Sequence, residues 1–131
     1  MMKLSIAAGL ALMALTTVSH AAGDIAEGEK AFKKCAACHA VGPDAKNKVG
    51  PVLNGIVGRP IASIADFKYS PAMTEFGAGK VWDEANLTGY LADPKGFIPK
   101  NKMAFVGLKK EEELKGVIAY LAQYNADGSK K

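Results

Sequence analysis

The segment CAACH at residues 35–39 contains both cysteines of the chain, Cys35 and Cys38, and His39 follows the second one directly. Cysteines at this spacing occur in redox dithiols, in zinc sites and at the attachment points of covalently bound haem. Each of these sites requires a different fold around it. The choice among them therefore constrains what the rest of the chain can form.

The first residues have the features of an export signal. Lys3 precedes an apolar stretch at 4–18, and the small residues up to Ala21 fit the pattern that a signal peptidase reads. A membrane anchor is the alternative, but the stretch is short for a span and runs into the cleavage pattern. We therefore expect 1–21 to be a cleaved signal peptide and 22–131 to be one periplasmic domain that does not span the membrane.

Charge and histidine content exclude several function classes. The 131-residue chain has a formal net charge of +4, spread along the sequence without a basic run, which argues against nucleic-acid binding. Of its two histidines, His20 lies in the predicted signal peptide, so His39 is the only one in the mature protein. We expect a monomer.

The mature sequence predicts a small all-α domain. Apolar or small residues recur at helical spacing from Ile25 to Cys35, and further helices are expected near Ser70, at 83–94 and at 109–124. Residues 40–69 are rich in glycine and proline and predict loops, and the polar tail 125–131 is expected to be frayed. Three to four helices with long loops provide only a modest core, so a large apolar cofactor is needed to complete it.

The alternatives at the cysteine pair are not equally supported. A structural zinc site needs four Cys or His ligands, and the mature chain has only three such residues. A thioredoxin-like dithiol normally follows a strand in a βαβ unit, whereas Cys35 and Cys38 end an amphipathic helix. A disulfide between them closes too short a loop to stabilise much. Neither the dithiol nor the disulfide explains why His39 follows.

Covalent haem attachment accounts for all three residues. Cysteines three positions apart lie on the same side of a helical turn, so both sulfurs can form thioethers with one porphyrin. The next residue then lies under the ring, where its imidazole can bind the iron. The sequence therefore predicts one haem c per chain, attached through Cys35 and Cys38, with His39 as a ligand.

Four motifs along the mature chain resemble the class I c-type cytochromes, the family of mitochondrial cytochrome c and the bacterial cytochromes c2. The motifs are CAACH (35–39), VGPVLNGIVGR (49–59), YLADPK (90–95) and IPKNKMAFVGLK (98–109). The resemblance extends over essentially the whole mature chain. It implies the small cytochrome c fold, an all-α fold wrapped around one covalently bound haem.

The resemblance also implies the surroundings of the iron. Met103 is expected to be the sixth ligand, which leaves Met73 as an ordinary core or surface methionine. The carbonyl of Pro51 is expected to accept a hydrogen bond from the histidine ligand, which fixes the tautomer of the ring. Tyr90 is expected to line the cavity beside Met103.

Other family positions are expected to surround a haem propionate or to shape the ligand loop. Arg59, Tyr69 and Trp82 are the expected propionate neighbours. Where the family often has Pro-Gly-Thr-Lys-Met, this chain has PKNKM, so Lys100 replaces a flexible glycine and Asn101 replaces a threonine. Asn101 can still donate a hydrogen bond and is expected to be a cofactor-binding residue. The crossing of the first and last helices is expected to involve Gly28, Phe32, Val117, Tyr120 and Leu121.

The function that the resemblance implies is one-electron transfer without catalysis. The iron would alternate between Fe(III) and Fe(II), taking electrons from a cytochrome bc1 complex and passing them to a photosynthetic reaction centre or a terminal oxidase. Alternatives are an electron acceptor for a periplasmic dehydrogenase and, in a different class, a c-type haem peroxidase or gas-binding protein. Lysines expected to surround the exposed haem edge and dock acidic partners are Lys34, Lys46, Lys48, Lys95, Lys102 and Lys109.

Overall fold

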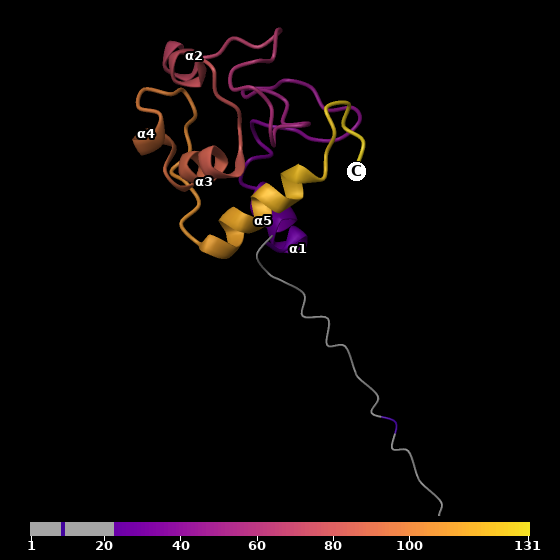
Figure 1. The fold of residues 1–131 in the computed structure, drawn as a ribbon. Helices are drawn as coiled ribbons and strands as arrows, with labels where there is room; N and C mark the ends of the chain where they lie inside the picture. The colour runs from indigo at the N-terminus through magenta and orange to yellow at the C-terminus, as the bar shows by residue number, and fades with distance from the viewer. Residues whose placement is uncertain (1–8, 10–22) are drawn as a thin grey trace, which may run out of the picture.

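The computed structural model describes residue 9 and residues 23–131, so the predicted signal peptide at 1–21 lies outside the described residues except for Gly9. Five helices form the described part of the chain (Figure 1): α1 Ile25–Phe32, α2 Pro71–Gly77, α3 Glu84–Ala92, α4 Pro94–Phe97 and α5 Glu111–Ala122. The described residues contain two isolated β-bridges and no strand. The prediction of an all-α fold is confirmed, and loops separate the helices.

Side chains at the helix ends explain where most of the helices begin. The carboxylate of Asp24 accepts a hydrogen bond from the amide of Ala26 at 2.8 Å, and Asp83 caps α3 in the same way. Ser70 caps α2, with Pro71 in its first turn. These three starts agree with the sequence prediction. The element that was not expected is α4, a single turn that raises the helix count to five.

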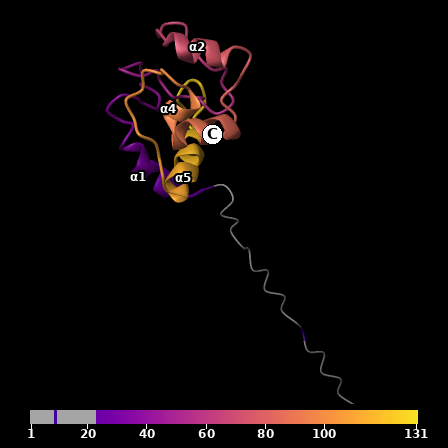
Figure 2. The same ribbon diagram turned by 90° about the vertical axis from the view of Figure 1, so that its left-hand side faces the viewer.

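Helices α1 and α5 cross at a pair of glycines. A Cβ built on Gly28 would overlap the carbonyl oxygen of Gly116, and a Cβ on Gly116 would lie 2.8 Å from the amide nitrogen of Gly28. The rings of Phe32 and Tyr120 pack beside this contact, with their centroids 5.3 Å apart. The two helices lie side by side in both ribbon views (Figures 1 and 2). Gly28 was expected at the crossing, whereas Gly116 was not.

The C-terminal segment is ordered by contacts with the long loop. The amide of Asn125 donates to the carbonyl of Ser129 at 2.8 Å, and Tyr124 forms a β-bridge with Lys130. Gly128 is buried against the carbonyl of Gly42, with no room for a side chain. The expectation of a frayed tail is therefore wrong. The polar composition of the tail does not indicate this turn, which is held in place by packing against Gly42 of the loop at 40–69.

We expect Gly28→Ala to destabilise the protein by about 2 kcal/mol, because the added methyl group forces two helix backbones apart. Unfolding by guanidinium chloride, followed by far-ultraviolet circular dichroism, measures the effect. Lys30→Ala, on the exposed side of the same helix, serves as the control and should change stability by less than about 0.5 kcal/mol. Equal stability of the two variants would show that the crossing tolerates a Cβ.

Candidate haem site

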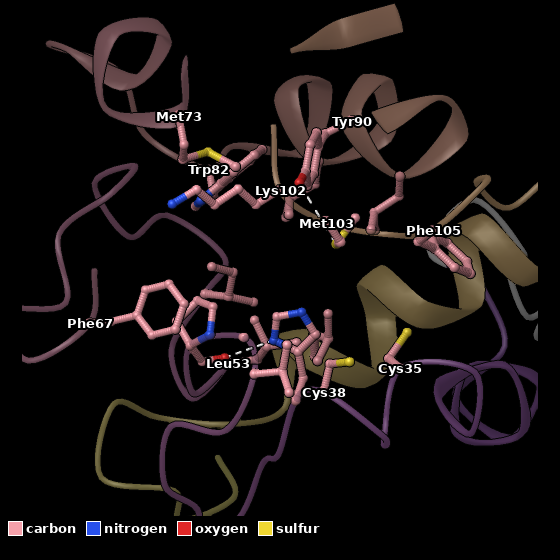
Figure 3. A pocket seen from close by; sticks show the side chains of 18 of the residues that line it. Cys35, Cys38, Leu53, Phe67, Met73, Trp82, Tyr90, Lys102, Met103 and Phe105 are labelled. Carbon is pink, nitrogen blue, oxygen red and sulfur yellow. Dashed lines mark hydrogen bonds between the residues drawn. The ribbon is translucent and has the colours of Figure 1, made fainter. Parts of the chain in front are cut away.

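A mostly apolar cavity of about 310 Å³ lies at the centre of the fold. Six separate parts of the chain contribute to its walls: 32–39, 49–59, 67–73, 82–91, 102–105, and Val117 and Leu121 of α5. Figure 3 shows Met73, Trp82, Tyr90 and Met103 along one side, with Cys35, Cys38 and Leu53 on the other. The volume falls at the lower end of the range for ligand sites in proteins.

The turn that follows α1 carries the two cysteines and the histidine. The amides of Cys38 and His39 both donate to the carbonyl of Cys35, at 3.0 and 2.9 Å. Both cysteines are half-buried free thiols that line the cavity. Burial raises the pKa of the Cys35 thiol, although the nearby charge of Lys34 opposes the shift. A thiol that stays protonated at neutral pH is a poor redox nucleophile, which argues against a thioredoxin-like dithiol.

His39 is held as a neutral imidazole with one nitrogen left for a ligand bond. Its Nδ1 donates to the carbonyl oxygen of Pro51 at 2.8 Å, since a carbonyl can only accept. Burial is the main cause that lowers the pKa of His39; the Pro51 hydrogen bond opposes it, and the charges of Arg59 and Lys48 lower it further. With the proton on Nδ1, the lone pair is on Nε2. This is the form that binds metals.

Gly50 packs directly against the imidazole ring of His39. A Cβ at position 50 would overlap Cε1 of the ring and lie 2.7 Å from both ring nitrogens. The Gly50 amide also donates to the carbonyl of Cys38 at 2.8 Å, which ties the loop to the cysteine turn. Sequence reasoning did not assign Gly50 a role. Its place between Val49 and Pro51 in a matched family motif was the available signal.

Met103 lies on the wall opposite the cysteines, beside Tyr90. The hydroxyl of Tyr90 donates to Sδ of Met103 at 3.7 Å, a contact that is dashed in Figure 3. Trp82 packs against the Tyr90 ring with a centroid distance of 5.1 Å. Burial raises the pKa of Tyr90 to about 12, so its hydroxyl remains a hydrogen-bond donor at neutral pH. The Met103 sulfur is thus oriented by a neutral donor in an apolar wall.

Arg59 brings an uncompensated positive charge to the cavity. Its Nη1 donates to the carbonyls of Val52 and Asn54, at 2.8 and 3.2 Å, while the buried Nε has no hydrogen-bond partner. Burial lowers the pKa of the guanidinium, but arginine stays charged in proteins. No ion pair within residues 23–131 includes Arg59. Arg59 itself is half-buried, but its buried, partnerless Nε is a place where an anionic group would stabilise the charge.

The structure brings together nine of the ten predicted cofactor-binding residues. Cys35, Cys38, His39, Pro51, Arg59, Tyr69, Trp82, Tyr90 and Met103 all line the one cavity. Asn101 does not line it; its side chain is buried at 5% exposure and bonded to backbone groups. Met73, expected to be an ordinary core or surface residue, also lines the cavity, because α2 places it there.

The six lysines of the expected docking set are all exposed: Lys34, Lys46, Lys48, Lys95, Lys102 and Lys109. Lys34 and Lys102 contribute to the cavity lining. Lys34 also forms an ion pair with Glu113 at 3.0 Å, while Lys48 and Lys109 each donate to a backbone carbonyl at 2.7 Å. Two of the six lysines therefore lie at the cavity, and three of the six have side chains that bond to other residues of the protein.

The residues present fit a haem. A neutral imidazole and a thioether suit iron, two thiols stand at one side of an apolar cavity, and the partnerless Nε of Arg59 suits a carboxylate. By contrast, no group of three or more His, Cys, Asp or Glu side chains within the described residues is arranged to hold a metal ion directly. The donor set thus favours a porphyrin over a zinc site.

Comparison with known proteins decides the family. The family model described as "Cytochrome c" matches residues 25–125. The chain belongs to the cytochrome c family. It is 49% identical to cytochrome c2 of Blastochloris viridis over 123 residues, covering 94% of this chain and 95% of that protein. Identity to cytochrome c2 of Agrobacterium tumefaciens is 55% over 100 residues, covering 76% and 90%.

A solved structure shares the fold. The structure of cytochrome c2 from Rhodospirillum centenum superposes with a TM-score of 0.73 at 43% identity, covering 79% of this chain and 99% of that one. As a member of the cytochrome c family, the protein is an electron carrier and not an enzyme. Membership also implies a covalently bound haem c, and the chain has the cysteine pair for it.

We expect Gly50→Ala to lower the free energy of unfolding by about 1 to 3 kcal/mol, because the new methyl group displaces the His39 ring or the loop. Guanidinium unfolding of the purified haem-containing protein measures the change. The control is Val49→Ala, one residue earlier, where the side chain is 79% exposed and the cost should stay below about 0.5 kcal/mol. Equal stability of the two variants would contradict this packing.

Proposed function

We propose that the protein is a periplasmic one-electron carrier holding one haem c through Cys35 and Cys38, with His39 and Met103 as the axial ligands. The observation that carries the proposal is the cavity itself, which receives two thiols and a neutral imidazole from residues 35–39 and a thioether from Met103. The bound haem supplies an iron that gains or loses one electron between Fe(III) and Fe(II). No substrate bond is made or broken.

The chain contributes orientation and a low-polarity environment. Pro51 fixes the proton on Nδ1 of His39, which makes Nε2 the donor atom. Tyr90 orients the Met103 sulfur, and the apolar walls exclude water. A dry, apolar surrounding disfavours extra positive charge, so it favours the reduced state and raises the potential. Arg59 offers its unpartnered Nε to an anionic substituent.

The same residues argue against the rival haem chemistries. A peroxidase or a gas-binding protein needs an open axial position, whereas Met103 is held beside Tyr90 by a side-chain bond and by its own backbone amide. With His39 and Met103 both bound to it, the iron would have no free position for oxygen or peroxide. The fixed position of Met103 therefore favours an outer-sphere electron carrier over a haem enzyme.

For partners, we propose a cytochrome bc1 complex as electron source and a photosynthetic reaction centre or a terminal oxidase as sink. The support is the similarity to cytochromes c2 and the exposed lysines around the cavity, which suit acidic docking faces. A periplasmic dehydrogenase remains the alternative source, and no nucleic-acid role is proposed. The protein would act as a monomer.

For localisation, we propose export to the periplasm with cleavage after Ala21. One support is the sequence pattern of residues 1–21. The other is covalent attachment of the haem, because an exported protein would lose a cofactor that can diffuse away. Within residue 9 and residues 23–131, no helix is both long and apolar enough to cross a membrane. N-terminal sequencing of the exported protein tests the cleavage position.

We expect the oxidised protein to show the weak far-red absorption band of methionine bound to Fe(III), and Met103→Leu to abolish it. Met73→Leu is the matched control, because Met73 lines the same cavity and should leave the band intact. Visible spectra of the exported, haem-loaded proteins measure both. Loss of the band in Met73→Leu alone would reverse the assignment of the ligand, and a high-spin wild-type spectrum would overturn the carrier function.

We expect Lys102→Gln to slow reduction by a purified cytochrome bc1 complex about two- to tenfold at low salt, because it removes a positive charge at the cavity. The difference should shrink as ionic strength rises. Stopped-flow kinetics measure the rates, with Lys80→Gln as the control, since Lys80 is exposed but does not line the cavity. An equal effect of both variants would show that the partner does not dock preferentially at the cavity.

A further inference from the structure

We propose that Asn101 is a positioning residue that holds Met103 in place by linking its backbone to α4. The inference rests on the proposed role of Met103 as an iron ligand. It assigns Asn101 a task different from the cofactor contact expected at this position, because the side chain is bonded to backbone groups and does not line the cavity.

The side chain of Asn101 forms three short hydrogen bonds. Its Nδ2 donates to the carbonyls of Pro94 and Ile98, both at 2.8 Å, and its Oδ1 accepts from the amide of Met103 at 2.8 Å. An amide NH₂ group has two protons, so both donors are used, and none remains for a propionate. The residue is 5% exposed, and bonds at this depth are costly to break.

The two carbonyl acceptors belong to deeply buried residues. Pro94 and Ile98 are among the most deeply buried side chains of the described chain; Pro94 is the first residue of the single-turn helix α4, and Ile98 caps its end. Asn101 therefore connects a fixed element to the Met103 amide. The position of the Met103 sulfur, which is half-buried beside Tyr90, therefore depends on that connection.

The residue before Asn101 adds strain that this connection must resist. Lys100 has a φ of 66°, in the left-handed region that a side chain disfavours. The turn is closed by a hydrogen bond from the Asn101 amide to the carbonyl of Ile98 at 3.2 Å. Without the side-chain bonds of Asn101, the turn could relax toward an ordinary φ, which would carry the Met103 amide away from its position.

The chain contains a matched asparagine on another loop. Asn54 is 6% exposed; its Oδ1 accepts from the amide of Gly42 at 2.8 Å, and its Nδ2 donates to the carbonyl of the same residue at 2.8 Å. Asn54 has the same chemistry and depth as Asn101 but no hydrogen bond to the Met103 loop. The pair therefore separates a general loss of stability from a specific effect on Met103.

The test measures how easily an added ligand displaces Met103. Imidazole is titrated into the oxidised, haem-loaded protein, and binding is followed by the loss of the far-red band. Asn101→Asp replaces Nδ2 and both of its N–H donors with a single carboxylate oxygen that faces two carbonyls, so we expect imidazole to bind about tenfold more tightly than in the wild type. Asn101→Ser, which is too short to bridge both carbonyls, should act in the same direction and serves if the first variant does not fold.

The control variant is Asn54→Asp, and guanidinium unfolding is measured for every protein. We expect Asn54→Asp to lower global stability as Asn101→Asp does, while its imidazole affinity stays within about twofold of the wild type. If the Asn101 variants lose stability but bind imidazole like the wild type, the inference is overturned and Asn101 is merely structural. If the wild type lacks the far-red band, the proposed ligation by Met103 fails instead.

Discussion

The hydrogen bond from Nδ1 of His39 to the carbonyl of Pro51 is the interaction on which the site depends. It joins the turn after α1 to the loop at 49–59, and it leaves Nε2 as the donor atom. Gly50 makes the bond possible, because any larger residue at that position would occupy the space of the ring. The imidazole is therefore held by backbone groups of the 49–59 loop as well as by the turn that carries it.

The opposite wall is held in a different way. Met103 lies in an extended loop, and its position depends on side-chain bonds from Tyr90 and Asn101. A ligand fixed through side chains on a loop is easier to displace than one fixed by a helical turn and a packed backbone. We therefore expect the Met103 side of the cavity to rearrange more easily than the His39 side.

How much was predictable differs from residue to residue. The caps at Asp24 and Asp83 follow from local patterns, Gly28 at the α1 crossing was expected from the family resemblance, and the structure has them where they were expected. The cysteines were expected at the end of the first helix, but α1 ends at Phe32 and they lie in the turn that follows it. The single-turn helix α4 was missed because four residues have no periodicity to detect. The tail was misread because its order comes from Gly128 packing on Gly42, a contact between residues far apart in the chain.

The sequence by itself narrowed the chemistry: after residue 21 it has two cysteines, one histidine and two methionines, which permit very few ways to hold a haem. It also determined the helical architecture, since periodicity and capping are local properties. The tertiary structure alone decided which side chains meet. It brought Met73 to the cavity, turned Asn101 away from it, and left Nε of Arg59 without a partner. These outcomes depend on how distant segments pack together, and local sequence patterns do not specify that packing.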